Sequence, residues 1–357
     1  MSAIGNNLKR IRLLKNMSLK DAGSLLNMST TAISKYEKGL IHPDSKKLIE
    51  FANAYNVKTL DLLKTYNNPE MKFNAFRKKK RLTGQNLQLL EEIIQNEVAN
   101  YLEVIELNNM EPENVKFKKF ICNNIDDAEA AANKFRDSIE ISSKQPISDL
   151  INILENLGIV IIQIKNPDNR FNDFDGLSEI VNNIPIIVVL DGIKDGARQR
   201  FTIAHELGHL ILNIKSKNID EERMCNRFAS SLLMPKDAVI NEFGISRRNI
   251  SFFELKAFKE EYKVSYTAIL YRLKDLNIIS EYLYKNISIF LSQKRLNKDD
   301  PNPIIPEISH QFKRLVYKLE TNEIITLNKA CELLGVSIDE YNEEDNNNWY
   351  KYNNRLK

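Results

Sequence analysis

The chain has 357 residues, of which 43% are hydrophobic and 28% are charged, and both values lie in the range of globular proteins. The length indicates two or three domains, and the composition excludes both wholesale disorder and a small disulfide-stapled scaffold. The three cysteines, Cys122, Cys225 and Cys331, are a sparse and odd set, so we expect no disulfide framework and a reducing compartment.

The net charge of +3 hides an uneven distribution. Residues 1–66 hold 11 basic and 5 acidic side chains and residues 67–85 hold 6 and 1, which gives +6 and +5 and leaves −8 for the remainder. Positive charge at one end is expected of a segment that meets a polyanion. No secretory pattern opens the chain and no apolar stretch is long enough to span a bilayer, so we expect a cytoplasmic protein without membrane contact.

The first 66 residues are predicted to form five short helices separated by polar turns. Ser18 and Ser29 each precede a helical pattern as N-caps, and Gly39 follows the third helix, where a left-handed residue is favoured. The expected helices cover residues 4–14, 18–26, 29–37, 45–55 and 58–66. This pattern predicts a compact all-α domain over residues 1–66.

The segment from Ser18 to Gly39 resembles the helix-turn-helix of XRE-type, Cro-like repressors. In that arrangement Leu25, Met28 and Ile33 would hold two helices at a fixed angle and present the second helix to the major groove of double-stranded DNA. Serine and threonine can contact bases or phosphates, whereas lysines mainly hold the phosphate backbone. The candidate DNA-contacting residues are Thr30, Thr31, Ser34, Lys35 and Lys38.

Two features leave alternatives open for this module. Leu19 stands where these repressors commonly have a glutamine that contacts phosphate. Folds of this type also serve as dimerisation or docking modules. Protein docking therefore stays an alternative to DNA binding, and the oligomeric state, including a homodimer, stays open.

A polar break at residues 67–69 leads to the basic run Arg77 to Arg81 and then to an amphipathic helix from about Gln85 to Leu107. The basic run fits either additional phosphate contacts or a solvated helix face. We expect residues 67–125 to form a basic linker and a connecting helix that packs on a neighbouring domain.

Residues 126–290 combine helices with short apolar strands. Helices are expected at residues 128–140 and 147–157, two strand-like runs at 159–164 and 185–190 with residues 176–180 between them, and a long helix from about Arg198. This order predicts an α+β domain with a small sheet. A second helix-turn-helix pattern around residues 264–268 is expected to complete the same domain, and residues 291–357 are expected to form a helical C-terminal region with a frayed tail.

The long helix carries the sequence His205-Glu206-Leu207-Gly208-His209. Positions i and i+4 of a helix lie one above the other, so the two histidines can point at one metal ion with Glu206 beside it. A divalent metal with one open position lowers the pKa of a bound water to about 7 and polarises a scissile carbonyl. Glu206 would be the general base that takes the proton from that water.

A metal held by two histidines needs a third protein ligand, and the next helical run, residues 219–231, supplies three carboxylates near its start. These are Asp220, Glu221 and Glu222. Helical periodicity alone does not choose between them.

The stretches around this motif closely resemble the ImmA/IrrE family of metallopeptidases. The similarity covers Arg198 to His209, Glu222 to Ala229 and Leu232 to Pro235, and it extends upstream to residue 146. The resemblance implies that Glu222 is the third ligand and that the domain has a zincin-like fold. Cys225 stands where alanine is usual in this family, which leaves two roles open for it, packing and a soft alternative ligand.

These observations predict a multidomain, mainly α protein, with an all-α helix-turn-helix domain followed by an α+β zincin-like domain with a small sheet and a helical C-terminal region. The resemblance implies a metalloendopeptidase that cleaves a partner protein, with a helix-turn-helix transcriptional repressor as the expected substrate. One divalent ion is expected, Zn²⁺ first on general affinity and Mn²⁺ as the alternative. Other interpretations are a DNA-binding regulator whose peptidase-like domain senses a metal or a partner, and one component of a toxin-antitoxin pair.

Overall fold

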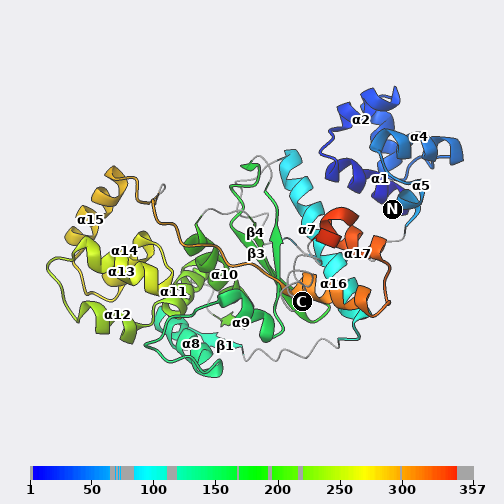
Figure 1. Cartoon of the computed structure of the whole chain (residues 1–357). Coiled ribbons are helices and arrows are strands. Elements are labelled where there is room, and N and C mark those ends of the chain that lie inside the picture. The colour runs from blue at the N-terminus through cyan, green and yellow to red at the C-terminus, as the bar shows by residue number, and fades with distance from the viewer. Residues whose placement is uncertain are drawn as a thin grey trace. The chain divides into compact units, whose positions relative to one another are not determined.

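The computed structural model of the chain describes residues 3–64, 69, 71, 73, 84–110, 119–166, 169–191, 195–215, 220–297 and 300–343 (Figure 1). The basic run from Arg77 to Arg81 and the predicted frayed tail from residue 344 onward lie outside these residues. Among the described helices, none combines the length and the apolar character that crossing a membrane requires. The chain divides into two compact units, the first formed by Met1–Glu111 with His310–Lys357 and the second by Pro112–Ser309.

The first unit opens with the five predicted helices: α1 (Ala3–Leu14), α2 (Leu19–Leu26), α3 (Thr30–Glu37), α4 (Ser45–Tyr55) and α5 (Thr59–Leu63). Ser18 begins α2 with a capping box, because its side chain accepts a hydrogen bond from the backbone of Asp21 and the Asp21 side chain accepts one from the backbone of Ser18. Ser29 caps α3, and Gly39 follows α3 with a φ of +69°. The predicted N-caps and the predicted left-handed glycine are confirmed.

The turn between α2 and α3 depends on a close approach of two backbones. A Cβ atom at Gly23 would lie 2.6 Å from the carbonyl oxygen of Met28, so glycine is required at this position. Asn27 ends α2 in the left-handed conformation and lets the chain turn into α3.

The contacts that hold α2 and α3 together are partly those predicted. Ile33 is fully buried and Met28 packs against the core of the five helices, but the Leu25 side chain is 56% exposed. The prediction for Leu25 is wrong because the inner face of α2 is formed by Ala22 and Leu26, and Leu25 lies to the side of that face.

The first unit also contains α7 (Gly84–Leu107), α16 (Gln311–Thr321) and α17 (Leu327–Leu334). Val104 of α7 is buried in one cluster with Val316 and Leu319 of α16, and the Tyr101 hydroxyl donates a hydrogen bond of 2.6 Å to Gln311. The two compact units group the chain differently from the four predicted segments. Residues 310–343 join α7, and residues 291–309 belong to the second unit, because the apolar faces of α7, α16 and α17 cover one another.

A three-stranded sheet lies in the second unit, in the order β2 (Val160–Ile164), β4 (Ile184–Leu190) and β3 (Gly176–Val181). β2 runs parallel to β4, and β3 runs antiparallel to it, with Ser178 opposite Ile187. Every residue of β4 is buried, as expected of a central strand that is covered on both faces. The two predicted strand-like runs are confirmed as β2 and β4, and residues 176–180 between them lie in β3.

The sequence does not predict a second, two-stranded sheet. In this sheet β1 (Phe120–Cys122) pairs in parallel with β5 (Leu212–Ile214). Each strand has three residues, which is too short for an alternation of apolar and polar side chains to be recognised.

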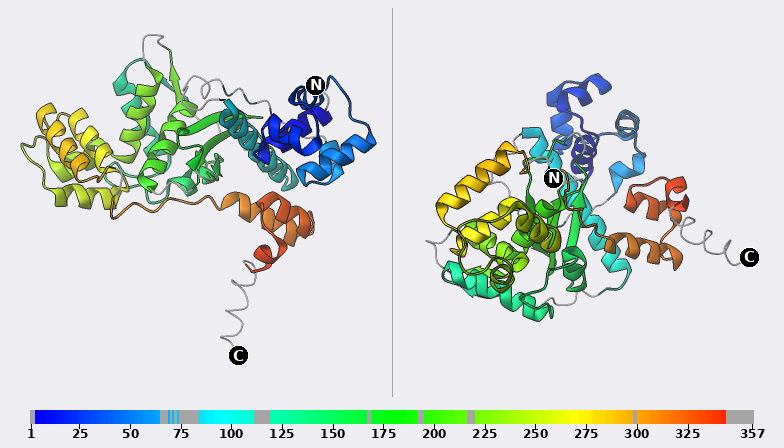
Figure 2. Two further views of the ribbon diagram at one scale, coloured as in Figure 1. Left: turned by 90° about the horizontal axis from the view of Figure 1, so that it is seen from above. Right: turned by 60° about the vertical axis from the view of Figure 1, so that its left-hand side comes forward.

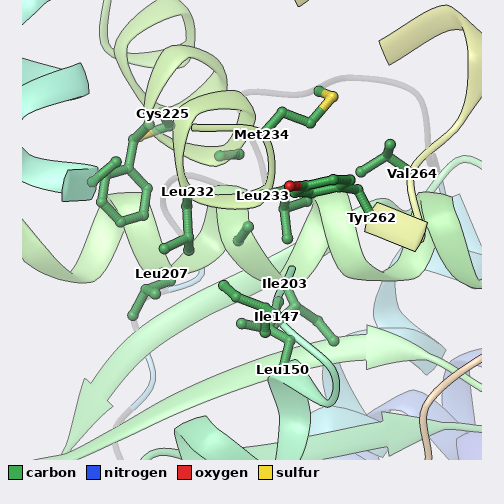
Figure 3. Close-up of a cluster of buried hydrophobic side chains, with 14 of the residues drawn as sticks. Ile147, Leu150, Ile203, Leu207, Cys225, Leu232, Leu233, Met234, Tyr262 and Val264 are labelled. Carbon is green, nitrogen blue, oxygen red and sulfur yellow. The ribbon is translucent and has the colours of Figure 1, made fainter. Parts of the chain in front are cut away.

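The part of the core that supports the predicted site lies between the sheet and four helices, α8 (Ile125–Ser138), α9 (Leu150–Asn156), α10 (Gly196–Ile211) and α11 (Glu221–Leu233). Helix α11 packs against both α8 and α10, and α10 packs against β3 and β4. Figure 3 shows Ile203 and Leu207 of α10 in one buried cluster with Leu232 and Leu233 of α11. This cluster fixes α10 against α11, the two helices that carry the predicted metal ligands.

Four further helices follow, α12 (Lys236–Phe243), α13 (Phe252–Tyr262), α14 (Tyr266–Asp275) and α15 (Glu281–Gln293). The turn between α13 and α14 repeats the turn between α2 and α3: Lys263 takes the left-handed conformation that Asn27 takes, and Ser265 caps the next helix as Ser29 does. Arg272 on α14 is fully buried. This second helix-turn-helix is therefore packed into the unit, as the sequence predicts.

Candidate metal centre

Helix α10 presents His205, Glu206 and His209 together. Asp195 caps the start of the helix by accepting a hydrogen bond from the Ala197 backbone. The two Nε2 atoms of the histidines lie 3.2 Å apart, one helical turn from each other. His205 and Glu206 are buried and His209 is half-buried, so these polar side chains require partners.

Helix α11 supplies the third group, Glu222. Its Oε2 atom lies 3.3 Å from Nε2 of His205, and its Oε1 atom lies 3.6 Å from Nε2 of His209. Ligand atoms of these three residues all lie within 4.8 Å of one another. A tetrahedral zinc site with bonds of about 2.0–2.1 Å separates its ligand atoms by about 3.3 Å. The spacing and the chemistry of the three side chains therefore fit a divalent ion.

The two neighbouring carboxylates have other partners. Asp220 caps α11 by accepting a hydrogen bond of 3.0 Å from the Glu222 backbone. Glu221 places Oε1 3.0 Å from Nδ1 of His209. Of the three acidic residues that helical periodicity leaves open, Glu222 is thus the one that faces both Nε2 atoms.

Each histidine also meets α11 through its Nδ1 atom. Nδ1 of His205 lies 2.9 Å from the side-chain oxygen of Asn226, and Nδ1 of His209 faces Glu221. Because both partners accept hydrogen bonds, they keep a proton on Nδ1 and turn Nε2 toward the metal position. No role of Asn226 is predicted from the sequence, although its position one turn after Glu222 on the same helix face is a signal that could have identified it.

Glu206 has a separate partner on the sheet. Ser178 of β3 donates a hydrogen bond of 2.8 Å to Oε2 of Glu206. Gly176 makes room for this contact, since a Cβ atom there would lie 2.8 Å from Cγ2 of Thr202 and 3.0 Å from Cγ of Glu206. The roles of Ser178 and Gly176 are not predicted from the sequence, because only the packing of β3 on α10 brings these residues to the site.

Cys225 is fully buried and lies against α10, where a Cβ atom at Gly208 would be 3.3 Å from its sulfur. This contact agrees with the packing role among the two roles left open. Burial lowers the pKa of His209, but hydrogen bonds with Cys225 and Glu222 raise that pKa to about 11. The metal-free imidazole therefore holds a proton near neutral pH, and a metal must displace it.

A charge network around the buried Arg272 fixes α11 against α8 and α14. Glu129 of α8 pairs with Arg272 at 2.6 Å and with Arg227 at 3.2 Å, and Arg227 pairs with Asp275 at 2.5 Å. Arg227 directly follows Asn226 on α11. The network thus holds the helix that carries the partners of both histidines.

In the first unit, α3 carries four of the five candidate DNA-contacting residues, and the fifth, Lys38, follows it as the C-cap. Of these, Thr30, Thr31, Lys35 and Lys38 are exposed and Ser34 is half-buried. Glu37 of the same helix is buried and forms an ion pair with Arg12 of α1. This pair fixes α3 on α1 while the candidate residues stay at the surface.

Two family profiles match the chain. Residues 154–274 match the IrrE N-terminal-like domain, a peptidase family, and residues 8–62 match the profile described as Helix-turn-helix. The first match contains α10, α11 and β3, and the second contains α2 and α3. No curated protein matches the chain. The chain therefore combines an XRE-type helix-turn-helix domain with a following domain of the ImmA/IrrE peptidase family.

Proposed function

We propose that the protein is a metal-dependent endopeptidase joined to a DNA-binding module. The observation that carries the proposal is the separation of roles at the site. His205, His209 and Glu222 gather their ligand atoms around one point, while Glu206 stands next to them with its own hydrogen bond from Ser178. A chain that only binds a metal needs the first three residues, but hydrolysis also needs a positioned base.

A divalent ion bound there would lower the pKa of a water to about 7 and polarise the carbonyl of the bond to be cleaved. Glu206 takes a proton from the attacking water and later returns it to the leaving amine. Ser178 donates a hydrogen bond to Oε2 of Glu206, which orients the carboxylate. Asn226 and Glu221 orient the two imidazole rings.

The position of β3 supports an extended peptide as the substrate. β3 is an outer strand of its sheet and pairs with β4 along one side. Ser178 lies on this strand and touches Glu206. A substrate that pairs with the other side of β3 would bring its backbone carbonyls next to the base.

The helix-turn-helix domain supports a substrate that is itself found on DNA. We propose that α3 contacts double-stranded DNA through Lys35 and Lys38 on phosphates and through Thr30, Thr31 and Ser34 on bases or phosphates. A peptidase tethered to DNA meets a repressor bound nearby at a raised local concentration. A helix-turn-helix repressor is therefore the proposed substrate, and Zn²⁺ or Mn²⁺ the proposed metal.

The experiment compares the metal-loaded wild type with Glu206→Gln, using a helix-turn-helix repressor encoded beside the gene as the substrate. We expect the variant to bind metal and DNA normally but to cleave at least about a hundredfold more slowly. Glu260→Gln, on the exposed side of α13, is the matched control and should cleave normally. Equal regulation of a reporter gene by wild type and Glu206→Gln would instead favour a regulator that senses metal or a partner without cleaving it.

A further inference from the structure

An extended segment after α15 is bound along the helix that carries the metal ligands. It covers residues 300–309, contains three prolines and leads from the second unit toward α16 (Figures 1 and 2, orange). We call these ten residues the strap. At its start Asp300 pairs with the buried Lys259 at 3.0 Å, and at its end the backbone N–H of Ser309 donates a hydrogen bond of 2.7 Å to Gln163 of β2.

The strongest contact of the strap is made by Glu307. Its carboxylate pairs with Arg200, a fully buried residue of α10, and also accepts a hydrogen bond of 2.9 Å from the backbone of Ile151. Arg200 donates a second hydrogen bond, of 2.7 Å, to the carbonyl of Ile147. A buried guanidinium without a counter-charge is strongly unfavourable, so Arg200 depends on Glu307 to remain buried in the core of the second unit.

The strap backbone continues this contact along α10. The side chain of Gln199 accepts a hydrogen bond from the N–H of Glu307 at 2.8 Å and donates one to its carbonyl at 2.9 Å. Gly196 donates its N–H to the carbonyl of Ile304 at 2.8 Å. A Cβ atom at Gly196 would lie 2.5 Å from the carbonyl oxygen of Ile305, so glycine is needed for the strap to come this close.

We propose that Glu307 is a positioning residue of the metal centre: through Arg200 it sets where α10 places His205 and Glu206. Residue 307 lies outside the range that matches the peptidase family, 154–274, so the metal centre depends on a segment beyond the matched domain. The inference rests on the proposed metal site but does not require peptide hydrolysis.

The link from Glu307 to the metal ligands is short. Arg200 and His205 lie five residues apart on one continuous helix. His205 must meet Asn226 at 2.9 Å and Glu206 must meet Ser178 at 2.8 Å. Hydrogen bonds of this length tolerate little displacement, so a small shift of α10 would break both.

The first test is Glu307→Gln, which keeps a hydrogen-bonding side chain but removes the charge. We expect its dissociation constant for Zn²⁺, measured against a competing chelator, to rise roughly 10- to 100-fold, as for other residues that orient metal ligands. Ile308→Ala is the matched control, because this neighbouring strap residue is 62% exposed. The affinity of this variant for Zn²⁺ should equal that of the wild type. Circular dichroism of each variant checks that the chain is folded during the measurement.

A second variant tests the strap without touching a charge. Gly196→Ala adds a methyl group where the strap backbone lies, and alanine otherwise favours a helix. We expect Gly196→Ala to raise the dissociation constant for Zn²⁺, as Glu307→Gln does. Wild-type affinity in both folded variants would overturn the proposal.

Amide hydrogen exchange of the metal-free chain separates this inference from the proposed function. We expect faster exchange of residues 203–209 in Glu307→Gln than in the wild type and in Ile308→Ala. Unchanged exchange in Glu307→Gln would contradict the positioning role. If the wild type binds no metal but exchange is still faster in Glu307→Gln than in the wild type, the proposed function is refuted. The effect of the strap on α10 then still stands.

Discussion

The Nδ1 atom of His205 lies 2.9 Å from the side-chain oxygen of Asn226, so the residue that orients one histidine comes from the helix that also carries Glu222. The same helix supplies Glu221 to His209. Helix α11 therefore has two tasks, to bring a carboxylate to the site and to hold both imidazole rings. A substitution that removes either the carboxylate or one of the contacts to the imidazole rings should first lower the affinity for the metal.

Asn226→Ala removes the acceptor for His205 while leaving the three candidate ligands in place. We expect Zn²⁺ affinity to fall roughly 10- to 100-fold, because the ring loses the partner that fixes its orientation and its protonated nitrogen. Isothermal titration with a competing chelator measures the change. Arg223→Ala, an exposed residue of the same helix, should bind Zn²⁺ as the wild type does, and equal affinity in Asn226→Ala would show that the hydrogen bond has no part in the site.

Metal binding should release a proton from His209. The raised pKa of this residue, about 11, means that its metal-free ring is protonated at pH 7, and a metal competes with that proton. At pH values below that pKa, the affinity for Zn²⁺ should therefore rise about tenfold for each unit by which the pH increases. Calorimetry in buffers with different heats of ionisation counts the protons released, and a count of zero at pH 7 would contradict this prediction.

Gly176→Ala should impair catalysis more than metal binding. The new methyl group would lie within 3.0 Å of Thr202 and Glu206, so the base must move away from Ser178. We expect a loss of about 1–3 kcal/mol in stability from the added volume and a lower kcat at nearly unchanged Zn²⁺ affinity. Denaturant unfolding and steady-state kinetics measure the two effects, and an unchanged kcat would speak against the role of this contact.

Glu129 should make the second unit sensitive to acid. Burial alone would raise the pKa of this carboxyl, but its bonds with Arg272 and the charge of Arg227 lower that pKa below its usual value. A carboxyl whose pKa is lower in the folded than in the unfolded chain stabilises the folded state at pH values above its unfolded pKa of about 4.5. This stabilisation is lost as the pH falls through the pKa of the folded chain. Glu129→Gln leaves the fully buried Arg272 without its counter-charge, while Arg227 keeps Asp275, and we expect a loss of about 3–5 kcal/mol at pH 7.

The comparison that checks this prediction is the free energy of unfolding of wild type and Glu129→Gln between pH 7 and pH 3. The difference between the two proteins should shrink as the pH falls. A difference that stays constant over this range would mean that the charge of Glu129 does not contribute to stability.

Lys35→Ala should weaken DNA binding through the loss of one phosphate contact. For a DNA duplex, the slope of log affinity against log salt concentration should decrease by about 0.9. Fluorescence anisotropy at several salt concentrations gives this slope. Lys15→Ala, an exposed lysine after α1, is the control, and an unchanged slope in Lys35→Ala would favour protein docking by this module.

Local signals in the sequence predict much of the fold and the central part of the site. Ser18, Ser29 and Gly39 mark helix ends because capping involves residues a few positions apart. His205 and His209 are recognised for the same reason, since one helical turn sets their spacing. Strands β2 and β4 of the larger sheet follow from apolar runs that are long enough to be recognised.

Features that depend on distant parts of the chain could not be predicted in this way. Ser178 meets Glu206 only because β3 packs on α10, and Glu307 meets Arg200 from more than a hundred residues away. Leu25 has the spacing of a core residue but lies beside the face that packs. The grouping of α16 and α17 with α7 likewise requires knowledge of which apolar faces cover one another.

The most direct test of the account is X-ray absorption spectroscopy at the zinc edge, on the Zn²⁺-loaded wild type and on Glu222→Gln. The account predicts that the wild type binds zinc through nitrogen and oxygen atoms at about 2.0–2.1 Å, with two imidazoles, and that Glu222→Gln loses one oxygen ligand and most of its affinity. A sulfur ligand at about 2.3 Å, or a site unchanged in Glu222→Gln, would contradict it.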